Sequence, residues 1–280
     1  PHQKAAVYST DKGTISITNA KQLQGKELSY NNLNDADGAF EMVCEFSEPS
    51  CAVIKHANPC GIASGKNAHQ AWVKALSCDP ISAFGGIVAF NCEVDAEFAS
   101  SLGKMFLEVI IAPSYTKEAL EILAVKKNLR VLETGATFDT KSDRMISKNI
   151  HGGILRQSYD KGGTTIADCT VATDRKPTDQ EWADLMFAWK TVKFVKSNAI
   201  VYARDTQTVG IGAGQMSRVD SARIGAEKAN SHESAKNSAV ASDAFFPFAD
   251  GLEECIKAGA TSVIQPGGSK NDQEVIDAAN

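Results

Sequence analysis

Apolar residues recur along this chain with two alternating spacings. Between positions 36 and 46, Ala39, Phe40 and Val43 follow the spacing of a helix face. The next segment, 51–55, is a short apolar run typical of a buried strand. The alternation continues, with helices predicted over 67–77, 96–106 and 117–127 and strands over 87–90, 108–112 and 129–132. This rhythm predicts an α/β fold built on a mostly parallel, layered sheet.

The middle of the chain, 139–176, breaks this rhythm with two glycine pairs and only a short strand at 154–156. A second unit then opens at Thr178, whose spacing to Glu181 is that of a capping box. Its predicted elements are helices over 178–195, 218–229, from 250 and over 272–280, and strands over 199–203, 208–211, 239–242 and 262–265. We therefore expect two α/β units, 1–160 and 178–280, joined by 161–177, and an internal structural duplication.

Charge and composition narrow the class of protein. The 280 residues carry a net charge of −5 with a pI near 5.6, which argues against a partner that is a nucleic acid or a membrane surface. No apolar run approaches the ~18 residues of a membrane-spanning helix. Seven cysteines without a C-x-x-C pair fit reduced thiols in a cytoplasmic enzyme. Because the chain begins at Pro1 and its last helical stretch has no stop signal, we expect a piece of a longer protein.

The most informative polar residues are Lys55 and His56, which stand together where the strand 51–55 should end. Asn58, Pro59 and Gly61 predict a loop directly after them. Ligands of open α/β sheets bind at the carboxyl ends of strands. A cation beside a proton-transfer group at such an edge indicates acid–base chemistry on an anionic substrate, the alternative being a surface lysine and a hydrogen-bonded loop histidine.

Three further polar segments fall at predicted element ends: 196–198, the G-x-G-x-G loop 210–215, and 242–250. The glycine loop is either a tight turn or a row of backbone amides that meets an anion or a planar amide-rich ligand. The aromatic residues Phe245, Phe246 and Phe248 are either core or a ligand platform. His56 and Pro59-Cys60 faintly resemble a zinc-deaminase motif, but Asn58 replaces the required Glu and no second cysteine follows, so we expect no zinc.

Together these segments resemble one family, the aminoimidazole carboxamide ribonucleotide (AICAR) formyltransferase part of a bifunctional purine-biosynthesis protein. The matching stretches are LSYNNLNDA at 28–36, VIKHANPCG at 53–61, DPISAFGG at 79–86, VIIAP at 109–113, FVKSNAIV at 194–201, GIGAGQMSR at 210–218, SDAFFPF at 242–248 and IQPGGS at 264–269. They run through the chain in family order. From this resemblance we expect the family's inosine monophosphate cyclohydrolase domain, a C-terminal strand and two phosphate-binding arginines to lie outside this chain.

The resemblance implies two cytidine-deaminase-like α/β/α subdomains without zinc, and a homodimer with sites at the interface. It implies formyl transfer from the co-substrate 10-formyltetrahydrofolate to the 5-amino group of AICAR. The implied residues are Lys55, His56 and Asn198 for catalysis; Asn32, Gly85, Glu108, Phe245 and Asp250 for the nucleotide; Ile211, Gln265, Pro266 and Gly267 for the folate; and Asp243, with backbone near Val192 and Val195, for a monovalent cation such as potassium.

In this reading His56 removes a proton from the weakly nucleophilic amine, while Lys55 and Asn198 stabilise the negative oxygen of the tetrahedral intermediate. The sequence leaves open whether Lys55 or the protonated His56 returns a proton to the leaving N10. Two alternatives remain. The first is a catalytically weak nucleotide-binding or dimerisation fragment of the same protein. The second is a zinc deaminase.

Overall fold

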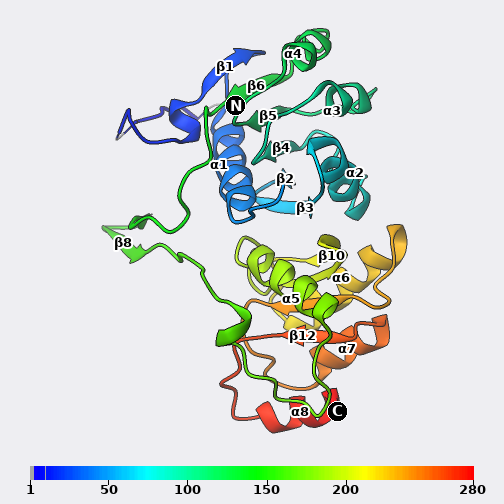
Figure 1. The fold of residues 1–280 in the computed structure, drawn as a ribbon. Coiled ribbons are helices and arrows are strands. Elements are labelled where there is room, and N and C mark those ends of the chain that lie inside the picture. The colour runs from blue at the N-terminus through cyan, green and yellow to red at the C-terminus, as the bar shows by residue number, and fades with distance from the viewer. Residues whose placement is uncertain (1–2, 10) are drawn as a thin grey trace.

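A ten-stranded sheet runs through the whole molecule in the computed structural model, which describes residues 3–9 and 11–280 (Figure 1). Its order is β1-β6-β5-β4-β2-β3-β10-β9-β11-β12. The strands are β1 Lys21–Gln24, β2 Ser50–Lys55, β3 Asn58–Ser64, β4 Ile87–Phe90, β5 Val109–Ala112, β6 Arg130–Glu133, β9 Ile200–Arg204, β10 Gln207–Gly212, β11 Ala239–Ser242 and β12 Ser262–Ile264. The helices are α1 Tyr30–Cys44, α2 Ala68–Cys78, α3 Ala96–Ser101, α4 Lys117–Leu123, α5 Asp179–Val192, α6 Arg218–His232, α7 Asp250–Ala258 and α8 Asp272–Ala279.

The α/β class is confirmed, and the sheet is mixed. The strand pairs β4–β5, β5–β6 and β11–β12 are parallel, and the other neighbours are antiparallel. The antiparallel pairs centre on two hairpins, β2–β3 and β9–β10. The predicted loop at 58–61 is wrong, because these residues begin β3.

Strand β3 accommodates residues that usually interrupt a strand. The register of β2 and β3 shifts between Ile54↔Pro59 and Val53↔Gly61, so Pro59 lies beside a bulge, where proline is tolerated. A Cβ on Gly61 would lie 2.0 Å from the backbone oxygen of Ala75, so α2 can approach β3 this closely only over a glycine. Both residues therefore serve the packing of a strand rather than a turn.

The two halves of the chain repeat one order of elements. The run α1-β2-β3-α2-β4-α3-β5-α4 is followed later by α5-β9-β10-α6-β11-α7-β12-α8. The sheet order is mirrored about the contact between β3 and β10 (Figure 1). This repeat supports the expected internal duplication, while its cytidine-deaminase-like identity stays a prediction.

Helices cover both faces of the sheet. Phe40 of α1 and Phe187 of α5 belong to one buried cluster with the strand residues Ile54 and Val201. The fully buried Trp72 of α2 packs edge-on against Phe98, with ring centroids 5.6 Å apart, in a separate buried cluster. The result is a three-layer sandwich whose strand ends remain free to carry chemistry.

The strand pairing between the two halves is short. Strands β3 and β10 share one registered pair, Gln207↔Ala63. Beside it, the buried Thr208 hydroxyl accepts a hydrogen bond from the Ile62 amide at 3.0 Å and donates one to the Ile62 carbonyl at 3.2 Å. A side chain thus takes the place of a ladder hydrogen bond.

A two-stranded hairpin, β7 Met145–Ile150 and β8 Gly153–Ser158, stands away from the main sheet (Figure 1). All its residues are exposed, including the apolar Ile146, Ile150 and Leu155. At its base, the Arg144 guanidinium pairs with Glu41 of α1 and stacks over the Tyr159 ring, 3.5 Å from the centroid. Within the described ranges, no helix is long and apolar enough to cross a membrane.

Candidate active site

One edge of the sheet gathers the predicted site residues. It contains the end of β2, the ends of β10, β11 and β12, and the beginnings of β4, β5 and β9. The first half therefore contributes the amino ends of its parallel strands, and the second half contributes the carboxyl ends. Lys55 has the expected carboxyl-end position on β2, whereas Gly85 and Glu108 precede the amino ends of β4 and β5.

Lys55 ends β2, and His56 is the first residue of the two-residue hairpin turn that follows. His56 and Ala57 have φ of 54° and 59°, the left-handed conformation of a type I′ turn. The carboxylate of Asp35, on α1, accepts hydrogen bonds from the amides of His56 at 2.9 Å and Ala57 at 3.0 Å. The Lys55 ammonium donates to the Phe84 carbonyl at 2.8 Å. The turn is thus fixed from both sides, and the imidazole is presented at the sheet edge.

The second hairpin is built the same way without a lysine–histidine pair. Asp205 and Thr206 have φ of 53° and 55°, and Asp184 of α5 accepts from the Thr206 amide at 2.8 Å. The left-handed turn is therefore a property of the repeated scaffold. What distinguishes the first turn is the chemistry of its side chains.

Asn198 lies on the loop before β9, next to the first hairpin. The two segments meet where the Asn58 side chain accepts from the Lys196 amide at 3.2 Å. The Asn198 amide nitrogen donates to the Gln215 carbonyl at 2.9 Å, and its oxygen accepts from Arg218 at 2.7 Å. The bond from Arg218 fixes the orientation of the amide. Its nitrogen carries two N–H groups and gives one to Gln215, so the second is left for a ligand oxygen.

Arg218, at the start of α6, is one of the site residues that sequence reasoning missed. The residue is 8% exposed, and its guanidinium pairs with Asp243 at 2.6 Å and donates to the Ser242 hydroxyl at 2.8 Å. Burial raises the pKa of the Asp243 carboxyl, but hydrogen bonds from Ser197 and Arg218 outweigh burial and hold that pKa below its usual range. The available signal was the arginine that closes the matched stretch GIGAGQMSR.

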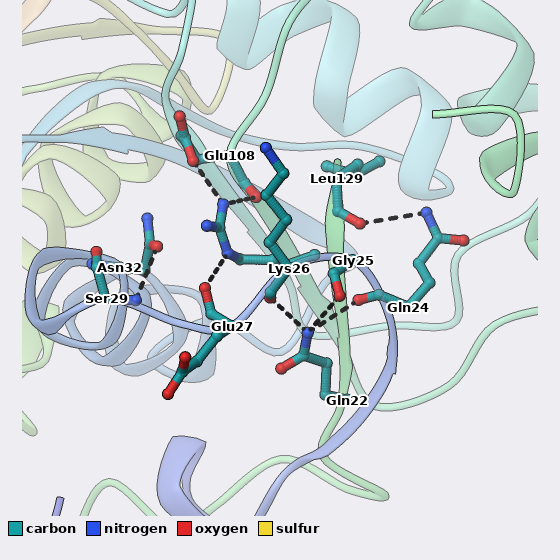
Figure 2. Close-up of polar contacts among 10 residues, drawn as sticks. Gln22, Gln24, Gly25, Lys26, Glu27, Ser29, Asn32, Glu108 and Leu129 are labelled. Carbon is teal, nitrogen blue, oxygen red and sulfur yellow. Dashed lines mark hydrogen bonds and ion pairs between the residues drawn. The ribbon is translucent and has the colours of Figure 1, made fainter. Parts of the chain in front are cut away.

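The predicted nucleotide residues of the first half lie together beside Lys55. Gly85 follows Phe84, has φ of 75°, and donates its amide to Phe106 at 2.8 Å. Glu108 precedes β5 and pairs with Arg130 at 2.6 Å (Figure 2). Asn32 lies in the first turn of α1, where it forms a capping box with Ser29.

The predicted residues of the second half form another group after β11 and β12. Phe245 is 41% exposed. The Gln265 side-chain oxygen accepts from the Phe246 amide at 2.7 Å, so its carbonyl holds the two loops together. Pro266, Gly267 and Asp250 line the same end of the strands. Ile211 is 6% exposed and belongs to the core, which leaves little of its side chain for folate.

These two groups are far apart along the edge. Neighbouring strands lie about 4.8 Å apart, so the six steps from β5 to β11 span roughly 29 Å. A single nucleotide is much shorter than that distance. Glu108 and Phe245 of one chain therefore cannot both contact one bound nucleotide.

A cavity of about 900 Å³ opens beside Asn198, between the carboxyl-terminal ends of α1 and α5. Val192, Val195, Ser197 and Asp243 line it, so the residues predicted for a monovalent cation share one surface. One carboxylate oxygen of Asp243 is already bound to Arg218. In the part of the chain that the structure describes, no three His, Cys, Asp or Glu residues cluster as metal ligands would.

Comparison with known proteins gives one consistent result. Residues 1–228 match the family model described as "AICARFT/IMPCHase bienzyme". The chain is 55% identical over 290 residues to the bifunctional purine biosynthesis protein PurH of Chelativorans sp. (strain BNC1), covering all of this chain and 54% of that protein. It is 54% identical over 288 residues to PurH of Rhodospirillum rubrum, covering all of this chain and 55% of that protein. The chain thus spans about half the length of the curated relatives it matches.

Proposed function

Because the chain belongs to the AICARFT/IMPCHase bienzyme family, we propose that it transfers the formyl group of 10-formyltetrahydrofolate to the 5-amino group of AICAR, a step in purine biosynthesis. The observation that carries this proposal is the Lys55–His56 turn, which Asp35 holds at the sheet edge beside the Asn198 loop. An imidazole, an ammonium group and a side-chain amide thus lie on adjoining segments, which supports the proposed roles.

The reaction needs three contributions from these residues. The amine loses a proton as its nitrogen bonds to the formyl carbon, and the His56 imidazole accepts it. Negative charge develops on the formyl oxygen, where the Lys55 ammonium and the remaining Asn198 N–H stabilise it; one such donor is worth ~3 kcal/mol. The bond from carbon to N10 then breaks, and N10 takes a proton from Lys55 or from the protonated His56.

We further propose a homodimer whose sites lie at the interface. The roughly 29 Å of sheet edge between β5 and β11 supports it, because a second copy can bring its second-half group to the first-half group of this copy. The exposed hairpin β7–β8 supports it as well, since isolated hairpins are at best marginally stable in water and this one carries exposed Ile146, Ile150 and Leu155.

The remaining proposals concern the cation and the cell compartment. Potassium prefers oxygen ligands, and Asp243, Ser197 and the backbone near Val192 line one cavity, so the residues fit such an ion if the free oxygen of Asp243 supplies the carboxylate ligand. Its contribution would be to hold the loop of Asn198 in place. The seven cysteines without disulfides support a cytoplasmic protein.

A formyl-transfer assay with AICAR and 10-formyltetrahydrofolate tests the function directly. His56→Ala should lower turnover by at least ~10²-fold, as expected for loss of a general base. Asp205→Ala changes the same position of the second hairpin, where the residue is exposed, and should keep parental turnover. Near-parental turnover of His56→Ala from pH 6 to 9 would exclude it as the base. Nucleotide binding without any turnover by the parent would instead favour a binding fragment.

A further inference from the structure

Arg130 begins β6 and connects two segments that lie far apart in the sequence. Its Nη1 lies 2.6 Å from Oε2 of Glu108, and its Nε donates to the Glu27 carbonyl at 2.9 Å. Its backbone amide also donates to the Glu108 carbonyl at 3.2 Å. Figure 2 shows Glu108 and Glu27 at opposite ends of these contacts, and the contact between Ser29 and Asn32.

The strand order dictates this arrangement. Strands β5 and β6 are parallel with Val109 opposite Arg130, so Glu108 lies beside the start of β6. Glu27 precedes Ser29, whose amide donates to the Asn32 side chain at 3.1 Å. The guanidinium therefore joins the Glu108 carboxylate to the segment that begins α1 and carries Asn32.

The contacts leave one carboxylate oxygen free. Oε2 of Glu108 is taken by Arg130, whereas Oε1 accepts no hydrogen bond from residues 3–9 or 11–280. The side chains are 12% exposed for Arg130 and 35% exposed for Glu108, so the arginine is shielded and the carboxylate is open. A planar guanidinium makes directional bonds and fixes the plane of a carboxylate better than an ammonium does.

We propose that Arg130 is a positioning residue for the nucleotide site: it holds Glu108 so that Oε1 accepts a hydrogen bond from a hydroxyl of the nucleotide. This inference rests on the proposed function. Arg130 also neutralises Glu108, which otherwise repels the phosphate of the same ligand. Of these two residues, only Glu108 touches the nucleotide, and Arg130 acts through Glu108.

Two measurements test this proposal: calorimetric titration of AICAR, and KM and kcat of the transfer reaction. The variants are Arg130→Met, Arg130→Lys, Glu108→Gln and the double variant Arg130→Met/Glu108→Gln. Losing one hydrogen bond to a charged group corresponds to a roughly ten- to hundredfold change in affinity. We expect Arg130→Met to raise Kd and KM for AICAR by about that factor while kcat changes less than about threefold. Arg130→Lys should recover part of the affinity, since an ammonium keeps the ion pair but loses the bond to Glu27.

Arg204→Met is the matched control. Arg204 also donates to two carbonyls, of Ser234 and Lys236, and lies 3.6 Å from the carboxylate of Glu233, but it stands at the opposite edge of the sheet. It should leave the affinity for AICAR unchanged. Because Arg130 acts through Glu108, the double variant should bind AICAR no more weakly than the single variant with the lower affinity for AICAR.

Parental affinity of Arg130→Met would overturn the inference. So would additive losses in the double variant, or equal losses in Arg130→Met and Arg204→Met. If Arg130→Met fails to fold by circular dichroism, parental affinity of both Arg130→Lys and Glu108→Gln would overturn it. A parent that binds no AICAR would refute the proposed function itself, a different result from a binding parent that is insensitive to Arg130.

Discussion

Replacing Asp35 by Ala tests whether the position of His56 depends on the hydrogen bonds that hold the first hairpin turn. The carboxylate accepts from two backbone amides, of His56 at 2.9 Å and of Ala57 at 3.0 Å. Each bond to a charged group is worth about 1.5–3 kcal/mol, so the pair contributes at most ~6 kcal/mol. Asp35 is 9% exposed, and water entering the vacated space restores part of the loss. We therefore expect a loss of ~3 kcal/mol, or roughly 6–12 °C in Tm for a chain of this size.

The same variant should lower formyl transfer by about 10²-fold, since a misplacement of about 1 Å is enough for such a loss. Asp184→Ala is the internal control, because Asp184 holds the second turn through one bond, to Thr206 at 2.8 Å. It should cost about half as much stability and leave turnover within about twofold of the parent. Urea unfolding followed by circular dichroism measures the first quantity, and initial rates at saturating AICAR measure the second.

Two results would refute this reasoning. If Asp35→Ala lost stability but kept its turnover, the position of His56 would not depend on the turn. If both variants lost turnover equally, the effect would be a general consequence of destabilisation. Adding Ala57→Gly to Asp35→Ala provides a further check: glycine adopts φ of 59° without strain, so it should restore up to about 1 kcal/mol of stability.

Further predictions concern the second half and the assembly. Asn198→Ala should lower kcat more than it raises KM, because we propose that its second N–H acts on charge that develops in the transition state. An unchanged kcat with a raised KM would place Asn198 in ground-state binding. Arg218→Met should lower the free energy of unfolding by about 3–5 kcal/mol, because it leaves Asp243 unpaired. The double variant Arg218→Met/Asp243→Asn should lose less, and equal urea midpoints of the two variants would contradict this. The pKa of Asp243 is lowered in the folded protein, so its ionised carboxylate stabilises the fold fully above the ordinary Asp pKa of about 4. This stabilisation is lost as the pH falls through the folded-state pKa. The stability advantage of the parent over Asp243→Asn should therefore shrink below about pH 4. Light scattering at micromolar concentration should show a homodimer, and a monodisperse monomer would count against the interface.

Periodicity predicted most elements because their cores are local in sequence. Helix 67–77 and strand 87–90 match α2 and β4 closely, since Trp72 and the run Ile87–Phe90 carry unambiguous spacing. The first turn of α1 was missed because Tyr30 to Asn34 are mostly polar; the turn depends on the capping box of Ser29. Strand β3 was missed because Pro59 and Gly61 are turn residues in most settings, and only the approach of α2 explains them.

The candidate site was predictable only in part, for the same reason. Lys55 and His56 carry their own signal, since they follow an apolar run directly. The residues that hold the site in place do not: Asp35 lies 21 positions from His56, Arg130 lies 22 positions from Glu108, and Arg218 lies 25 positions from Asp243. Their partners are set by which strands become neighbours, and a single sequence does not contain that information.

The seam between β3 and β10 has a consequence for how the molecule can be taken apart. Within the sheet, one registered pair and the Thr208 hydroxyl join two halves that each possess their own hairpin, helices and parallel strands. Outside it, the halves share the buried cluster of Phe40 and Phe187, which favours their association. Most of the backbone pairing of each half is internal to it. A break in the exposed hairpin β7–β8 would leave every strand of the main sheet intact. The chain is therefore suited to expression as two polypeptides that recombine into one sheet, with the Lys55–His56 turn on one and Asn198 on the other. The proposed activity would then report their reassembly.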